Sequence, residues 1–133
     1  MGAAENIQTI KAVYEAFGRG DVEAILAVVT DDVDWATETS SDGAPWYGVR
    51  HGRAEVTTFF VDLAKTMEVD EFTPLTFAAN DEDVTTIVRY TSHARETGKS
   101  TTMQLHHWFR FRDGKIASYR GTEDTALTLA TLA

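Results

Sequence analysis

The segment from Leu105 to Ile116 constrains the fold most strongly, because it predicts two antiparallel strands joined by a tight turn. Asp113-Gly114 lies between the two runs, and this pair favours a type I′ hairpin turn, whose two central residues need positive φ. Alternate side chains of a strand point to opposite faces. One face of the first strand then carries Leu105, His107, Phe109 and Phe111, and the other carries Gln104, His106, Trp108 and Arg110. The pattern therefore places one titratable group, His107, on an otherwise apolar face.

Helical patterns occupy the first half of the chain. Apolar residues recur at spacings of three and four, as in an amphipathic helix, at Ile7, Ile10, Val13, Tyr14 and Phe17. Gly18 and Gly20 end this helix, and Asp21 can cap a second, short one. A third helix is predicted from about Arg53 to Thr66, after a loop over 39–52 that is rich in turn formers.

The second half of the chain has the period of two that is typical of strands. A short strand at 33–37 is followed, after the third helix, by strand candidates at about 69–78, 84–95, 99–112 and 115–123. Helices first and strands afterwards favour an α+β fold, in which one face of a curved antiparallel sheet wraps around the helices. A chain of 133 residues fits one domain, which we expect to span 1–133.

Composition excludes several classes of partner and chemistry. The formal net charge of -9 and the lack of a Lys/Arg cluster argue against nucleic acid and anionic membranes as partners. With no cysteine there can be no disulfide, thiolate nucleophile or cysteine-based zinc site. The first residues lack the pattern of a signal peptide, and no apolar run reaches membrane-spanning length, so we expect a soluble cytoplasmic protein.

Several short motifs, each weak alone, occur in an order that resembles one family. They are Tyr14-Glu15-Ala16-Phe17, Gly20-Asp21, Asp31-Asp32-Val33, Gly48, Gly52-Arg53 and Asp113-Gly114-Lys115-Ile116. Over nearly the whole chain they resemble the SnoaL-like, ketosteroid-isomerase-like branch of the nuclear transport factor two superfamily. The resemblance implies a cone-shaped half-barrel of curved antiparallel sheet around three N-terminal helices, a pocket between helices and sheet, and a homodimer formed through the outer sheet face.

The resemblance also implies where a site would lie. Ketosteroid isomerases use a tyrosine on the first helix, an aspartate after the second helix and a protonated aspartic acid on a late strand. Those positions fall here on Val13, Thr37 and His107, so that mechanism does not transfer intact. Tyr14 adjoins the first position and Glu38 adjoins the second. The chain is more similar to the polyketide-cyclase branch, in which a strand histidine and a late aspartate transfer protons; here these would be His107 and Asp124.

His107 has two interpretations from sequence. Burial would disfavour its charged form and a nearby carboxylate would favour it, which are the conditions that tune a general acid or base. Alternatively, His107 is a neutral core histidine held by one hydrogen bond. Glu38 is likewise either a base or a solvated residue at the end of a strand, and Tyr14 is either a donor into the pocket or packing against the sheet.

Aromatic residues from several elements are candidates for lining an apolar ligand pocket, although each could equally be ordinary core. The substrate-binding candidates are Tyr14, Trp35, Trp46, Tyr47, Phe59, Tyr90 and Tyr119, with Trp46 and Tyr47 on a lid. We expect no metal site and no cofactor, because the four histidines show no ligand spacing and neighbours on a strand point apart.

Two functions follow as hypotheses. The first is a cofactor-independent acid–base enzyme with isomerase, polyketide-cyclase-like or hydratase/dehydratase chemistry on an apolar or mixed-polarity small molecule. The second is a non-catalytic ligand-binding or assembly module of the same fold. A cavity that His107 and a carboxylate both face would favour the enzyme, and an interior filled by side chains would favour the module.

Overall fold

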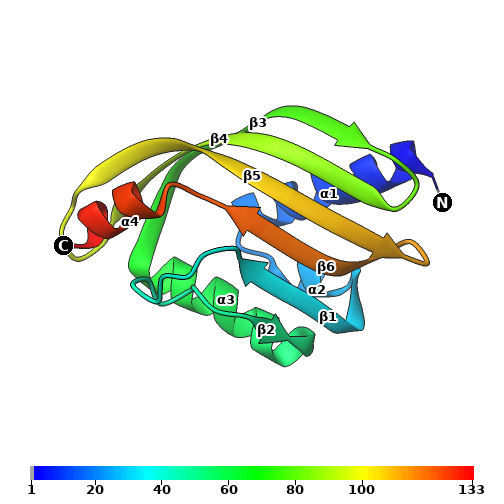
Figure 1. Cartoon of the computed structure of the whole chain (residues 1–133), viewed down its shortest axis with the longest axis horizontal. Coiled ribbons are helices and arrows are strands. Elements are labelled where there is room, and N and C mark those ends of the chain that lie inside the picture. The colour runs from blue at the N-terminus through cyan, green and yellow to red at the C-terminus, as the bar shows by residue number, and fades with distance from the viewer. Residues whose placement is uncertain (1) are drawn as a thin grey trace.

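A computed structural model describes residues 2–133 and contains one six-stranded sheet with four helices (Figure 1). The helices are α1 (Ala3–Gly18), α2 (Val22–Leu26), α3 (Gly52–Thr66) and α4 (Thr125–Leu132). The strands are β1 (Val29–Thr37), β2 (Arg50–His51), β3 (Met67–Ala79), β4 (Asp83–Ala94), β5 (Ser100–Arg112) and β6 (Lys115–Thr122). The order in the sheet is β2-β1-β6-β5-β4-β3. This confirms the expected α+β fold and every helix and strand predicted from the sequence.

The sheet is curved, and the helices α1, α2 and α3 lie along its inner side (Figure 1). The helix α1 packs against β3 and β4, whereas α3 packs against β1. Strands β3 to β6 form an antiparallel meander, and β1 joins it in parallel beside β6. The layer between sheet and helices therefore contains the core, including Phe109, Ile10 and Val56, each at most 1% exposed. Within residues 2–133, no helix has the length and apolar character needed to cross a bilayer.

The β5–β6 hairpin has the predicted geometry. Asp113 and Gly114 have φ of 53° and 79°, the two positive values that a type I′ turn requires. Strand β5 buries Phe109 and Phe111 and exposes Trp108, so the predicted division of its faces is also confirmed.

Two short elements were not predicted, β2 and α4. Asp124 caps the N-terminus of α4, where its side chain accepts a hydrogen bond from the backbone N–H of Leu127. The far end of α4 is tied to the β4–β5 turn, because Thr97 Oγ1 and Lys99 Nζ donate to the carbonyl oxygens of Thr131 and Ala133. The helix α4 therefore lies across one end of the sheet, next to that turn (Figure 1).

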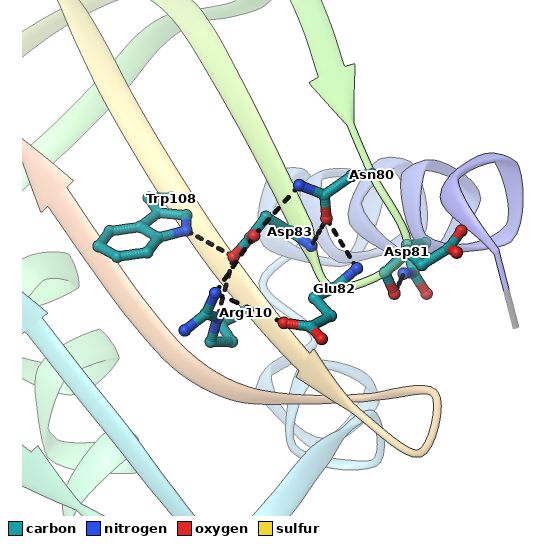
Figure 2. A network of polar contacts seen from close by, with 7 residues as sticks. Asn80, Asp81, Glu82, Asp83, Trp108 and Arg110 are labelled. Carbon is teal, nitrogen blue, oxygen red and sulfur yellow. Dashed lines mark hydrogen bonds and ion pairs between the residues drawn. The ribbon is translucent and has the colours of Figure 1, made fainter.

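Polar contacts order the outer face of the sheet around the carboxylate of Asp83 (Figure 2). Trp108 Nε1 and Arg110 Nε donate to Asp83 Oδ1 at 2.9 and 3.1 Å. The Arg110 guanidinium also lies 5.8 Å from the centre of the Trp108 ring. Trp108 is thus fixed in position although 46% of it is exposed.

Candidate functional site

An apolar cavity of about 80 Å³ lies between the helices and the inner face of the sheet. Every helix and every strand except β2 contributes to its lining, and so does the loop 38–49. The predicted site residues that line it are Tyr14, Trp35, Trp46, Phe59, Tyr90, His107 and Tyr119. Tyr47 and Asp124 are not among the lining residues. The fold thus brings together side chains that the sequence pattern could only place on separate elements.

His107 is the cavity end of a short chain of polar groups that runs through Tyr14 to Thr86. Its Nδ1 lies 2.7 Å from the hydroxyl of Tyr14, which in turn lies 2.5 Å from Thr86 Oγ1. Tyr14 therefore packs against the sheet, and its hydroxyl contacts Thr86 and His107 within the protein. Within the described chain, His107 Nε2 has no hydrogen-bond partner, and His107 lines both this cavity and a second hollow beside Glu38 and Arg120.

Burial sets the protonation of the site. Desolvation, with a smaller contribution from His106, lowers the pKa of His107 from 6.5 to about 3, so the ring is neutral at physiological pH. Burial also raises the pKa values of Tyr14 and Tyr119 well above their ordinary range. A neutral imidazole carries one N–H and one lone pair, so Nε2 donates if Tyr14 donates to Nδ1, and accepts in the other tautomer.

Tyr119 occupies the space beside His107 because position 121 has no side chain. The Tyr119 ring stacks on Trp35 with centroids 4.2 Å apart, and its centroid lies 5.3 Å from that of His107. A methyl carbon added at Gly121 would lie 2.0 Å from the Tyr119 hydroxyl oxygen and 3.4 Å from His107 Cδ2. Gly121 therefore lets the Tyr119 hydroxyl fold back over β6 towards His107.

We expect Gly121→Ala to destabilise the protein by about 1–3 kcal/mol, the usual cost of adding volume to a packed site. The new methyl group must displace the Tyr119 ring, and this also disturbs the stack with Trp35. Urea unfolding followed by circular dichroism measures the change. Gly18→Ala is the matched control, because an added methyl group there has no neighbour within 4 Å. Equal stability of the two variants would contradict the assigned role of Gly121.

A carboxylate that the sequence analysis missed, Glu123, lines the cavity where β6 leads into α4. Its Oε1 accepts from Trp46 Nε1 at 3.3 Å, and its Oε2 accepts from the hydroxyls of Tyr47 and Thr128 at 3.0 and 2.5 Å. These bonds attach the loop 38–49 to α4, and Gly43 packs directly against Leu129. The predicted lid residues Trp46 and Tyr47 are thus both anchored to one carboxylate.

The structure does not bring Asp124 to His107, which corrects the pairing that the resemblance implied. Asp124 is exposed and caps α4, so its carboxylate is committed to the backbone of that helix. Tyr47 is buried but contributes a hydrogen bond to Glu123 instead of a cavity wall. Glu38 pairs with Arg120 and lies in a hollow on the outer sheet face, while its neighbour Thr37 lines the cavity. Among Glu38, Glu123 and Asp124, only Glu123 lines the cavity.

The histidines do not assemble a metal site. His93 places its two ring nitrogens on two different carboxylates, Asp70 and Glu68, at 2.8 and 3.1 Å, so these groups do not converge on one point. Across the residues that the structure describes, no three His, Asp or Glu side chains are arranged to hold an ion.

Comparison with known proteins identifies the family. The family model of the SnoaL-like domain matches residues 10–119, which is most of the chain. The chain belongs to the SnoaL-like domain family. This confirms the resemblance inferred from the sequence motifs. No curated protein matches the sequence significantly.

Solved structures agree with the SnoaL-like assignment. An NTF2-like protein from Burkholderia pseudomallei is 28% identical, with a TM-score of 0.87 over 97% of this chain and 98% of that one. One from Burkholderia xenovorans is 26% identical, with a TM-score of 0.86 over 100% and 99%. A candidate polyketide cyclase from Xanthomonas campestris shares the fold at 20% identity, with a TM-score of 0.80 over 98% of both chains. A candidate isomerase from Rhodopseudomonas palustris and an LEH-like epoxide hydrolase from M. tuberculosis, at 22% and 16% identity, share it as well.

Proposed function

We propose that this SnoaL-like protein binds an apolar or mixed-polarity small molecule in the cavity and transfers a proton to or from it at His107. The observation that carries the proposal is the position of the His107 ring, which lines the cavity, is held at Nδ1 by Tyr14 and has no partner at Nε2 among the described residues. Isomerisation, aldol-type cyclisation and hydration or dehydration all need such a proton transfer. Neighbours of the same fold described as cyclase, isomerase and epoxide hydrolase are compatible with this range.

The geometry suggests how proton transfer would occur. Removal of a proton next to a ligand carbonyl turns neutral His107 into an imidazolium and the ligand into an enolate. Each charge alone would be costly in an apolar cavity, but as a close pair they stabilise each other. The tautomer in which Nε2 carries the hydrogen instead donates to the ligand oxygen, supported by the chain from Thr86 through Tyr14. The imidazole and the two hydroxyls suffice for either role, so the proposal includes no cofactor.

Proton–deuterium exchange tests the activity on simple carbonyl compounds that stand in for the natural substrate. A panel of small ketones, such as butanone and cyclobutanone, is incubated with the protein in heavy water, and loss of the α-proton signals is followed by NMR. We expect exchange to be faster than in buffer for at least one compound that binds in the cavity. Binding without acceleration across the panel would favour the alternative, a non-catalytic ligand-binding module.

We further propose that two copies pair through the outer sheet face. This face combines the exposed, fixed ring of Trp108 with Arg110, and both residue types are enriched at interfaces. It also carries both signs of charge, as a self-complementary two-fold contact requires. Wild-type protein should scatter as a dimer at micromolar concentration, and Trp108→Glu should scatter as a monomer with an unchanged circular dichroism spectrum. A monomeric wild type at high concentration would contradict the pairing.

A further inference from the structure

The carboxylate of Glu123 lines the same cavity as His107 and shares no hydrogen-bond partner with it. Three neutral donors surround the carboxylate: the Trp46 indole and the hydroxyls of Tyr47 and Thr128. In the described part of the chain, no Lys, Arg or His side chain forms an ion pair with it. The negative charge of Glu123 is therefore solvated by dipoles but not neutralised by a protein cation.

The hydrogen bonds to Glu123 leave room for one more donor. An ionised carboxylate offers about four acceptor positions. Oε2 accepts from two hydroxyls, whereas Oε1 accepts a single, longer bond of 3.3 Å from Trp46. One acceptor position on Oε1 is thus available to a ligand group that carries a hydrogen.

The charge of Glu123 acts on the interior of the cavity and not only on its rim. It contributes to raising the pKa values of Tyr90 and Tyr119, two residues of the cavity wall. Solvent still reaches this end, because Glu123 is half-buried and its neighbour Thr122 is exposed. A cation bound there loses only part of its hydration, which keeps the cost of burying it low.

We infer that Glu123 binds an ammonium group of the ligand, so that the cavity selects small organic amines with an apolar body. An ammonium supplies the missing donor on Oε1 and the missing positive charge in one group. The aromatic rings of Trp46, Tyr90 and Tyr119 line the same cavity and attract cations through their faces. This inference rests on the proposed ligand-binding function of the cavity and adds the chemical class of its ligand.

The size of the cavity determines which probes fit. At about 80 Å³ it is smaller than the roughly 150 Å³ of a cavity known to admit benzene, so the probes should have fewer non-hydrogen atoms than benzene. Isobutylamine is protonated at neutral pH, and isobutanol has the same shape without the charge. NMR titration at 150 mM salt, followed at the resonances of the cavity residues, gives the affinity of each.

The wild type should bind isobutylammonium at least tenfold more tightly than isobutanol, and Glu123→Gln should abolish this preference. Glu38→Gln is the matched control, since it also removes one negative charge but lies on the outer face beside Arg120. It should retain the preference. A wild type that binds both probes equally, or a Glu123→Gln variant that keeps the preference, would overturn the inference and leave the proposed function intact. If neither probe binds in the cavity, the inference and the proposed function are both refuted.

A measurement on the wild type covers the case in which Glu123→Gln does not fold. The Trp46 indole N–H donates to Glu123, so its resonance should move when isobutylammonium binds, while that of Trp108 should stay in place. Trp46→Phe assigns the signal. An unmoved Trp46 resonance at saturating amine would place the ammonium elsewhere and refute its binding at Glu123.

Discussion

Replacement of His107 by glutamine should lower catalysed proton exchange by about 10²–10⁴-fold, the usual contribution of a general acid or base. Glutamine keeps a polar group beside Tyr14, but its amide cannot take up or release a proton near neutral pH. The rate is measured by the heavy-water assay, on whichever ketone the wild type turns over. Ligand affinity should change much less than the rate, because most of the cavity wall remains.

Two variants separate chemistry from structure in this experiment. His106→Gln changes the neighbouring histidine, which is exposed on the outer face, and should leave the rate unchanged. Asp124→Ala removes the cap of α4 and should cost about 1 kcal/mol of stability, again with little effect on the rate. If His107→Gln exchanges protons as fast as the wild type, His107 has no catalytic role.

Stability should fall by about 2 kcal/mol between pH 8 and pH 5 because of His107 alone, at 1.36 kcal/mol per unit of pKa. The pKa of His107 is about 3 in the folded protein and 6.5 when the ring is not buried, so only the unfolded chain takes up this proton as the pH falls below 6.5. The contribution of His107 is therefore fully present above pH 6.5 and is lost progressively down to about pH 3. Tyr14 and Tyr119 face His107, and with their raised pKa values they stay neutral throughout this range.

The measurement is the difference in unfolding free energy between wild type and His107→Gln, determined by urea unfolding at pH 5, 6, 7 and 8. Taking the difference removes the contributions of other groups. His93 is one such group, because Asp70 and then Glu68 raise its pKa, so its stabilising effect is present at low pH and is lost as the pH rises. A pH-independent difference between the two proteins would mean that the His107 ring is not desolvated.

Local patterns were sufficient to predict most of the fold. Alternation along β5 placed His107 and Phe109 on the inner face, and Asp113-Gly114 defined the hairpin, because both signals depend only on neighbouring residues. The parallel pairing of β1 with β6 could not be predicted in this way, since it joins segments from opposite ends of the chain. The helix α4 was missed, although Asp124 before an apolar run is a capping signal.

The site was less predictable than the fold, because its geometry depends on where elements end. The position of His107 was predicted from strand periodicity, but the choice between Glu123 and Asp124 depends on a one-residue shift at the boundary between β6 and α4. That shift decides which carboxylate lines the cavity and which caps the helix. Likewise, no local pattern connects Trp46 and Tyr47 to Glu123, because their hydrogen bonds form only when the loop 38–49 meets α4.

The pairing of β1 with β6 has a consequence for synthesis on the ribosome. Trp35 is translated well before Tyr119, the ring on which it stacks. Until then the edge of β1 that pairs with β6 is open, which is a setting for aggregation. Contacts between such distant segments also slow folding. The nascent chain therefore has to stay soluble until β6 has been made and the inner wall can close.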